Sequence, residues 1–372
     1  MNAELVKFAA RIERVMSHPD CGFNELALEL YGLQFKYNPA YRLICEAKQL
    51  RPDKVRHWYE APFAHASTFK ELELSCIDPE ERTSVFHSSG TTEQKPSRHF
   101  HSWDSLKLYE GSLWAGFAEN LFRNNAGRTS CMPFRESSSH QLTGTDGKYD
   151  LLILTPSPGA VPHSSLVHMF ETVRRHLAAP ETVFVAKLGG ANAWVIDFKA
   201  ALAALRIGDE PKLILGTAFS FVHLLDSLAE SSVRLQLPIG SRVMETGGYK
   251  NRSRAMPKTE LHSLIMEYLG IPHENIICEY GMSELGSQAY DTGNPERYFH
   301  FPAWTGVQIV SPETGFEVSE GETGLVRIFD LANVFSVAAI QTEDLAIRRG
   351  CGFELIGRAA LAEVRGCSVM TV

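Results

Sequence analysis

The order of apolar and polar residues predicts helices near the N-terminus. Apolar side chains recur every three or four positions between residues 5 and 15, and again between residues 23 and 33. This spacing places them along one face of a helix, which can then pack against a core. The turn-forming stretch 18–22 separates the two patterns. We therefore predict two packed helices in a helical N-terminal region that spans residues 1–80.

Strand-like and helix-like patterns alternate through the middle of the chain. A helix is expected directly after the polar loop at residues 88–99, with Ser102 as its N-cap. Strands are then expected at 129–134, 150–155, 182–186, 212–216 and 241–245, and helices at 164–178, 194–206, 219–230 and 257–269. Strands and helices in strict alternation predict βαβ units and an α/β fold with a mainly parallel sheet flanked by helices.

The pattern changes past residue 300. Helical periodicity fades, and short strands are expected at 306–310, 324–330 and 353–357 between glycine-containing turns. We predict two domains, which are an α/β body over residues 1–300 and a small β-rich lobe over residues 301–372.

Composition narrows the classes of function. The 372 residues are 44% hydrophobic and carry a net charge of −8, which supports a sizeable core and argues against a large nucleic-acid or anionic-membrane footprint. The seven cysteines contain no C-x-x-C pair, so neither a disulfide framework nor a zinc site is indicated. We see no signal peptide and no apolar run of membrane-spanning length, and we expect a cytoplasmic protein without a membrane anchor.

The loop at residues 88–99 combines hydroxyl groups, glycine and positive charge. Its candidate phosphate-binding residues are Ser88, Ser89, Gly90, Thr91, Thr92 and Lys95. The preceding residues Val85 and Phe86 read as the end of a strand, and backbone N–H groups leaving such an end can point at an anion. The loop lacks the Gly-Lys-Ser/Thr ending of a Walker A motif. The alternative interpretation is a polar surface turn.

Two further polar clusters follow apolar runs. The first is Glu279–Glu284, after the strand-like residues 276–278, and the second is Thr342–Leu345, followed by Gly357 and Arg358. Open α/β sheets bind ligands beyond the carboxyl ends of their strands, which is where we expect the first cluster. Taken one at a time, these clusters favour an interpretation as solvated acidic loops and an ordinary turn.

In order along the chain, these motifs resemble those of the adenylate-forming superfamily, which includes acyl-CoA synthetases and luciferases. By this resemblance Ser88–Lys95 is the phosphate loop, Tyr280–Glu284 the adenine and magnesium motif, Thr342–Leu345 the ribose motif and Gly357–Arg358 the hinge. The segment Gly247, Gly248 and Tyr249 resembles the glycine pair that borders adenine and the acyl substrate. The resemblance implies ATP and Mg²⁺ as cofactors and a carboxylic acid as substrate.

Two features resemble a narrower family, the acyl-protein synthetases (long-chain fatty acid:protein ligases) of bacterial fatty-acid reductase complexes. They are the stretch 162–170 and the ending from Gly357 to Ser368. Typical superfamily members continue into a mobile C-terminal domain, and we expect that domain to be absent here. In the acyl-protein synthetases a cysteine close to the C-terminus accepts the acyl group, which the resemblance assigns to Cys367. It also implies an acyl-CoA-reductase-like protein partner.

The resemblance assigns roles to the remaining candidates. Lys95 and the loop hydroxyls would face the ATP phosphates, and Glu284 would hold Mg²⁺. Tyr280, Gly281 and Ser283 would line the nucleotide site, Asp344 would bind the ribose hydroxyls, and Arg358 would reach the nucleotide from the hinge. Thiolate is the nucleophilic form of Cys367.

Other interpretations remain open. One is an acyl-CoA or carrier-protein ligase of phenylacetate-CoA-ligase type, and another is a non-catalytic regulatory subunit of a reductase complex. The chain departs from the superfamily at Glu93, where glycine is usual. The pairs His99/His101 and His163/His168 lack a third metal ligand in the sequence pattern and are interpreted as structural or solvent-exposed. A serine hydrolase is not indicated, because no second glycine follows Ser283.

Overall fold

The computed structural model describes residues 2–17, 22–88, 95–122, 149–179, 182–190, 193–247, 256–291 and 297–359. Its helices are α1 (Ala3–Ser17), α2 (Phe23–Tyr37), α3 (Pro39–Ala47), α4 (Thr68–Glu71), α5 (Trp103–Phe122), α6 (Ser165–Leu177), α7 (Phe198–Arg206), α8 (Ala218–Glu230) and α9 (Lys258–Leu269). The N-terminal pair of helices is therefore confirmed.

The strands include most of those expected from the sequence. They are β1 (Ala64–His65), β2 (Ser84–His87), β3 (Arg98–His101), β4 (Asp150–Ile153), β5 (Thr182–Phe184), β6 (Ala186–Leu188), β7 (Trp194–Ile196), β8 (Lys212–Thr217), β9 (Arg242–Thr246), β10 (Ile276–Tyr280), β11 (Ala289–Asp291), β12 (Phe299–His300), β13 (Thr305–Val310), β14 (Thr323–Asp330), β15 (Ala339–Arg349) and β16 (Gly352–Arg358). The strand expected at 129–134 lies outside the described residues.

Two local expectations were wrong. The segment 194–206 begins as strand β7 and becomes helical only at α7, where the Asp197 side chain caps the first turn. The loop at 88–99 does not lead directly into a helix either. Strand β3 intervenes and pairs antiparallel with β2, so the loop is the tip of a hairpin. The Ser102 hydroxyl accepts the Ser105 N–H at 3.3 Å, as expected at the start of α5.

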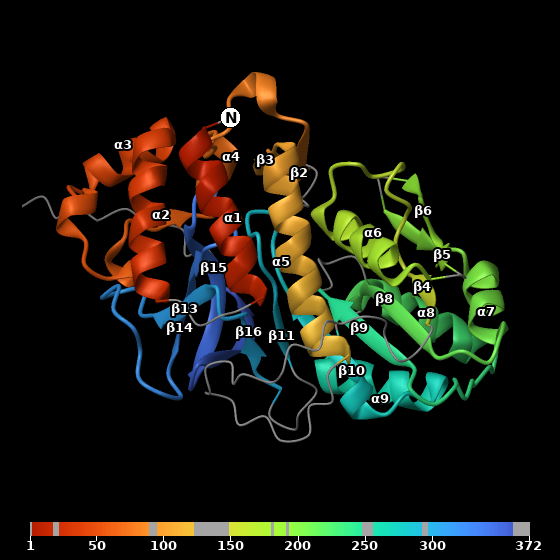
Figure 1. Ribbon diagram of the computed structural model, residues 1–372. Helices are drawn as coiled ribbons and strands as arrows, with labels where there is room; N and C mark the ends of the chain where they lie inside the picture. The colour runs from red at the N-terminus through yellow and green to blue at the C-terminus, as the bar shows by residue number, and fades with distance from the viewer. Residues whose placement is uncertain are drawn as a thin grey trace, which may run out of the picture.

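One 12-stranded sheet runs through the molecule, in the order β13-β14-β15-β16-β12-β11-β10-β9-β8-β4-β5, with β1 paired to β15. The neighbours from β10 to β5 are parallel. From β10 to β13 the neighbours are antiparallel. The expected parallel sheet is thus confirmed on one side and continues into an antiparallel side formed by the C-terminal strands (Figure 1).

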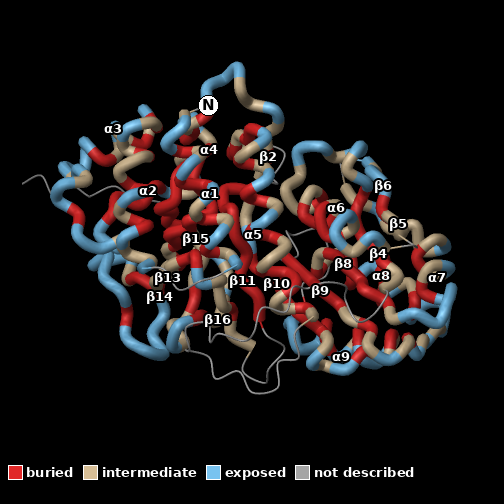
Figure 2. The backbone as a smooth tube through the Cα atoms, in the orientation of Figure 1, coloured by how far each residue is buried: buried red, intermediate tan, exposed pale blue. Residues whose placement is uncertain are grey.

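Helices cover both faces of the parallel part. Side chains of α7, α8 and α9 share a core with one face of β4, β8, β9 and β10. Side chains of α5 and α6 share a second core with the opposite face. The parallel strands are accordingly buried along most of their length (Figure 2). Burial on both faces explains why these strands read as continuous apolar runs.

The N-terminal helices pack on the antiparallel part of the sheet. Apolar residues of α1, α2 and α3 join those of β14 and β15 in one core. Strand β1 also pairs with β15, with Ala64 opposite Ile340. Residues from both sides of position 300 therefore share this core. The division into domains at that position stays a prediction.

Candidate nucleotide and acyl-transfer site

Strands β9 and β10 bring two predicted segments to one edge of the sheet. The strands are parallel, with Thr246 opposite Glu279, so their carboxyl ends lie side by side. Gly247 follows β9 with a φ of +68°, a conformation that favours glycine. Tyr280 ends β10 and is buried. Gly247 and Tyr280 therefore lie at the carboxyl edge of the parallel strands, which is where open α/β sheets bind ligands.

Three motifs that are far apart in the sequence converge at Tyr280. Its hydroxyl donates a hydrogen bond to Asp344 Oδ2 at 2.7 Å. The Arg358 Nε lies 3.4 Å from Asp344 Oδ1, while the arginine side chain is 80% exposed. Burial raises the pKa of Tyr280, so the phenol keeps its proton and remains a donor. We call Tyr280, Asp344 and Arg358 the convergent triad.

The pairing of β15 with β16 positions two members of the triad. Asp344 lies opposite Arg358, and the register shifts between Leu345 and Ala346. Gly357, at this irregularity, has a φ of +154°. The Asp344 N–H donates to the Thr342 hydroxyl at 3.1 Å, which holds the backbone of the aspartate. The motif Thr342–Leu345 therefore lies within a long strand, and β15 was not expected from the sequence.

The segment after Tyr280 carries a buried carboxyl group. Glu284 is 4% exposed, and the Ser283 hydroxyl donates to its Oε2 at 3.0 Å. Burial raises the pKa of Glu284, although the hydroxyls of Ser97 and Ser283 favour the ionised form. Asn333 also donates to the Glu284 carbonyl at 2.7 Å, which fixes the backbone. This carboxyl group would be stabilised as an anion by a cation placed beside it.

His99 connects the hairpin to this segment. It is buried in β3, and its Nδ1 lies 2.7 Å from the Ser283 carbonyl oxygen, so Nδ1 carries the donated proton. Burial lowers the pKa of His99 to about 4, which keeps the ring neutral. The interpretation of His99 as structural fits these contacts. They tie the base of the loop to the Tyr280–Glu284 motif.

Ser88 and Lys95 lie at the base of the hairpin loop. The Ser88 hydroxyl accepts the Ser97 N–H at 3.0 Å, which closes the loop. The Lys95 Nζ lies 3.9 Å from Glu71 Oε2, and its side chain is 55% exposed. Nothing in these contacts prevents the lysine from turning toward a phosphate group. The predicted loop residues Ser89, Gly90, Thr91 and Thr92, together with Glu93, lie outside the described residues.

Of the remaining predicted site residues, some belong to the described part of the chain and some do not. Gly281 lies directly above Glu279, because a Cβ built at Gly281 would be 2.4 Å from Glu279 Oε1. A side chain at this position would have to displace the Glu279 carboxyl group. Gly248, Tyr249 and Cys367 lie outside the described residues, so their roles stay predictions.

Glu279 is a residue at this edge to which the sequence pattern assigned no role. It is buried at the end of β10 and accepts a hydrogen bond from the Thr246 hydroxyl. Burial raises its pKa from 4.5 to about 7, with a further contribution from the charge of Glu245. An acidic residue inside a strand of apolar neighbours was the available signal, because such a group titrates abnormally when the strand is buried.

The wild-type protein should lose stability as the pH rises, because Glu279 must then ionise in its buried site. Replacing Glu279 with glutamine should remove this loss. The folded protein holds this proton more tightly than the unfolded chain, because the pKa is about 7 rather than 4.5. The wild-type free energy of unfolding should therefore fall between about pH 5 and pH 7 and then level off, by up to about 3 kcal/mol. Urea unfolding at a series of pH values measures the difference. Glu230→Gln, at the exposed end of α8, is the control, and parallel pH profiles for Glu279→Gln and wild type would contradict the expectation.

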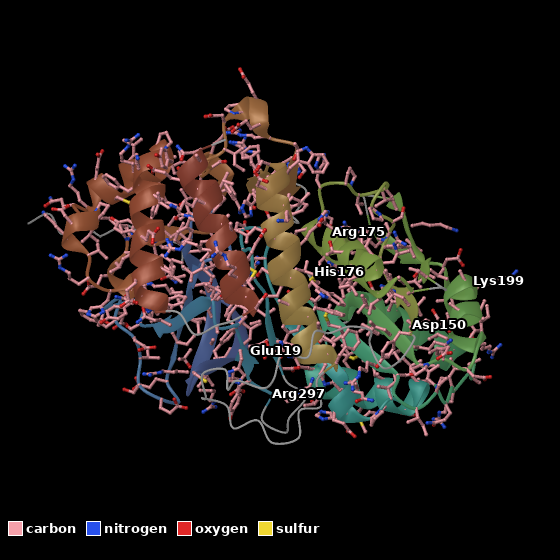
Figure 3. The ribbon with its side chains drawn as sticks, in the orientation of Figure 1. Glu119, Asp150, Arg175, His176, Lys199 and Arg297 are labelled. Carbon is pink, nitrogen blue, oxygen red and sulfur yellow. The ribbon has the colours of Figure 1, made fainter. Side chains whose placement is uncertain are left out.

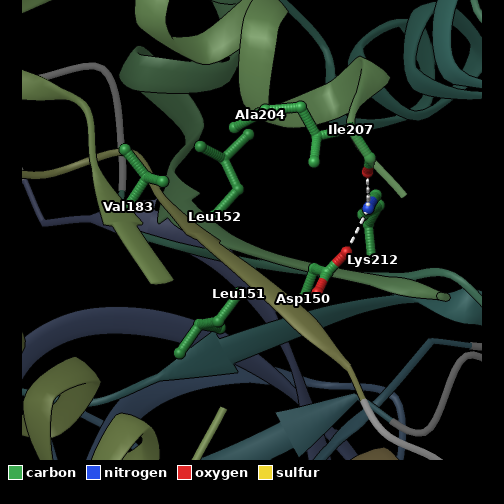
Figure 4. Close-up of a pocket in the computed structure, with 7 residues that line it drawn as sticks. All are labelled: Asp150, Leu151, Leu152, Val183, Ala204, Ile207 and Lys212. Carbon is green, nitrogen blue, oxygen red and sulfur yellow. Dashed lines mark hydrogen bonds and ion pairs between the residues drawn. The ribbon is translucent and has the colours of Figure 1, made fainter. Parts of the chain in front are cut away.

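A small cavity lies at the opposite end of the parallel strands. Its lining is mainly apolar and includes Asp150 and Lys212, the first residues of β4 and β8 (Figure 4). Lys212 is 2% exposed and bonds both Asp150 and the Ile207 carbonyl oxygen. Because both partners are at the amino ends of their strands, this ion pair is separate from the edge that carries Gly247 and Tyr280.

Helices α5 and α6 are joined by a second set of charges. Glu110 of α5 accepts hydrogen bonds from Arg175 at 2.7 Å (Figure 3) and from His168 Nε2 at 2.8 Å. His163 Nδ1 lies 3.1 Å from the Val85 carbonyl oxygen. The pair His163/His168 therefore holds α6 against α5 and β2, in line with its structural interpretation.

A comparison with protein families decides the affiliation of the chain. The family described as acyl-protein synthetase, LuxE, matches residues 151–371. The chain belongs to this family. A curated relative, the long-chain-fatty-acid–luciferin-component ligase of Aliivibrio fischeri, is 24% identical over 189 residues. The match covers 47% of this chain and 49% of the relative, so it spans about half the length of the curated protein.

Solved structures of 2-hydroxyisobutyryl-CoA ligase share the fold. The structure in the postadenylation state with 2-HIB-AMP has a TM-score of 0.66 and 13% identity, over 90% of this chain and 67% of the other. The open conformation with 2-HIB-AMP and CoA has a TM-score of 0.64 and 12% identity, over 90% and 69%. The predicted adenylate-forming fold and the resemblance to acyl-protein synthetases are both confirmed. Among the described residues, no helix has the length and hydrophobicity to cross a bilayer.

Proposed function

We propose that this acyl-protein synthetase family member activates a fatty or other carboxylic acid with ATP, forming an acyl-adenylate and pyrophosphate. The acyl group then passes to the Cys367 thiolate as a thioester, for delivery to an acyl-CoA-reductase-like partner. The single observation that carries the proposal is the convergent triad, which joins the adenine, ribose and hinge motifs in a chain of this family.

The first half-reaction needs positioning and charge stabilisation. The acid carboxylate attacks the α-phosphorus of ATP, and negative charge grows on the phosphate oxygens and on departing pyrophosphate. Lys95 offsets part of that charge, and the loop hydroxyls donate hydrogen bonds to the phosphate oxygens. Asp344 accepts hydrogen bonds from the ribose hydroxyls, and the Tyr280 hydroxyl holds the Asp344 carboxylate in place. Arg358, which is largely exposed beside Asp344, can approach bound nucleotide from the hinge.

Glu284 fits the requirements of a magnesium ligand. Magnesium prefers carboxylate oxygens, and this carboxylate is buried with its pKa raised by desolvation. When bound, Mg²⁺ supplies charge neutralisation to the phosphates. Ser283 orients the Glu284 carboxylate through the hydrogen bond to Oε2.

The second half-reaction needs an accessible thiol. The described cysteines include Cys45 and Cys278, which are buried, and Cys351, which is exposed. A buried thiol cannot reach an adenylate without opening the core. The proposal therefore keeps Cys367 as the acceptor and treats Cys351 as its competitor.

Intact-mass spectrometry tests the proposal. The full chain is incubated with ATP, Mg²⁺ and a panel of carboxylic acids, with and without CoA. A mass increase equal to one acyl group, released by hydroxylamine, supports acyl-protein synthesis. Acyl-CoA without a protein adduct would instead support the acyl-CoA ligase, and the absence of acid-dependent pyrophosphate exchange would support the regulatory subunit.

Removing the Tyr280 hydroxyl should weaken ATP binding. In Tyr280→Phe the Asp344 carboxylate loses its 2.7 Å hydrogen bond and is held less firmly toward the ribose. Loss of a hydrogen bond to a charged group is worth roughly a tenfold change in the KM for ATP. The rate of pyrophosphate exchange against ATP concentration measures it. Tyr37→Phe is the matched control, since Tyr37 makes a similar 2.7 Å bond to Glu4, a residue of α1 that belongs to none of the predicted motifs. Equal KM values for the two variants would count against the assigned role of Asp344.

A further inference from the structure

Three metal-ligating side chains meet on the α9 side of the sheet. Glu245 of β9 lies opposite Cys278 of β10 in the parallel register. His262 projects from α9, which covers this face (Figure 1). All three residues are buried, and their ligand atoms lie within 4.8 Å of one another. We call Glu245, His262 and Cys278 the buried donor cluster.

The cluster lies on the face opposite the hairpin. Side chains alternate along a strand, so Glu245 and Cys278 point toward α9, whereas their successors Thr246 and Glu279 point toward α5. The cores agree, because Val243 packs with α9 and Met244 packs with α5. The alternation separates the buried donor cluster from Thr246 and Glu279, whereas Tyr280 of the convergent triad follows Cys278 by two residues on β10.

Distances within the cluster suit a small metal ion. His262 Nε2 lies 3.6 Å from Cys278 Sγ and 3.6 Å from Glu245 Oε1. Ligand atoms around a tetrahedral zinc ion are separated by about 3.3 to 3.6 Å, given the usual zinc–ligand bond lengths. The third separation, from Cys278 Sγ to Glu245 Oε1, is 2.7 Å. This pair has to open by about 0.8 Å, which a rotation of the glutamate carboxylate can supply.

Neighbouring groups hold the sulfur and the backbone of Cys278 in place. Arg297 places a guanidinium nitrogen 3.6 Å from the sulfur and donates through Nε to Asp291 at 2.9 Å. Figure 3 shows Arg297 beside α9. Asp291 in turn accepts the Cys278 N–H at 2.7 Å. Hydrogen-bond donors of this kind around a ligand sulfur are common in metal sites and orient the ligand.

Charge balance is compatible with a divalent cation. Without a metal, the anions Glu245 and Asp291 are matched by Arg297 and by Lys258, which lies 3.9 Å from Asp291. A divalent ion that replaces the thiol proton adds one positive charge. The Lys258 side chain is 42% exposed and can turn into solvent, which restores neutrality.

We propose that Glu245, His262 and Cys278 bind one divalent metal ion of the zinc class. On binding, the Cys278 S–H bond breaks, its proton goes to solvent, and the metal forms bonds to sulfur, imidazole nitrogen and carboxylate oxygen. The second Glu245 oxygen or a water molecule completes four-coordination. The ion links β9, β10 and α9 next to Gly247 and Tyr280, and this role does not depend on the adenylation chemistry.

Cobalt binding tests the site without any activity measurement. Untagged full chain is prepared without ATP, treated with a chelator and titrated with Co²⁺. We expect one equivalent to bind, with a thiolate-to-cobalt charge-transfer band and the visible spectrum of a tetrahedral site. Zn²⁺ should displace the cobalt and raise the melting temperature.

Substitutions test whether the charge-transfer band arises from the buried donor cluster. Cys278→Ser should abolish the charge-transfer band, whereas Cys351→Ser should retain it. Cys351 is the matched control because its sulfur lies 3.9 Å from a histidine nitrogen, on His300. His262→Gln serves as a second variant, and circular dichroism establishes that each variant is folded.

The proposal is overturned if wild type shows no charge-transfer band in excess Co²⁺. It is equally overturned if the band survives in a folded Cys278→Ser or disappears in Cys351→Ser.

Discussion

Replacing Lys95 with alanine should slow acyl-adenylate formation by about 100- to 1,000-fold. Loss of one preorganised charge contact to a developing anion has an effect of this size in a shielded site. Lys95 follows the hydroxyl-rich loop and lies at the base of the β2–β3 hairpin, which His99 ties to the Tyr280–Glu284 motif. Acid-dependent pyrophosphate exchange at saturating ATP measures the rate.

The ion partner of Lys95 provides a matched control. Among the described residues Glu71 lies 3.9 Å from its Nζ, and both side chains are largely exposed. Such a surface ion pair contributes little to stability. Glu71→Gln should therefore leave adenylation unchanged, which separates a role toward phosphate from a role toward Glu71. Unchanged pyrophosphate exchange in Lys95→Ala would show that the loop does not act through this cation.

Replacing Cys367 with serine should abolish the acyl-protein adduct while leaving adenylation intact. Acyl-adenylate and pyrophosphate should still form, because the thiol acts only in the second half-reaction. The segment from Arg358 to Cys367 spans at most about 30 Å when extended, which is long enough to reach between two sites. Intact mass after incubation with ATP, Mg²⁺ and acid, followed by hydroxylamine, measures the adduct.

Cys351→Ser is the control for this experiment. Cys351 is the exposed thiol among the described cysteines, whereas Cys278 and Cys45 are buried. The Cys351 variant should acylate like wild type. An adduct that persists in Cys367→Ser and maps to Cys351 would move the nucleophile from the tail to the β15–β16 turn.

Local patterns in the sequence determined most of the elements. Helices α6, α8 and α9 and strands β4, β8 and β9 lie within one or two residues of their predicted bounds. Periodicity of side chains is a local property, so it can be read without knowing the fold. It failed at Trp194–Ile196, because a three-residue apolar run fits a strand and a helix equally well.

The sequence by itself also determined the family and the order of the motifs, since both depend on residue types at fixed spacings. Only the tertiary structure decided which side chains meet. The bond from Tyr280 to Asp344 depends on the register that sets Asp344 opposite Arg358, and that pairing joins residues far apart in the chain. The raised pKa of Glu279 likewise depends on α5 covering its strand, because desolvation is produced by neighbours that approach from elsewhere. Register and burial are long-range properties, and a pattern confined to one segment does not contain them.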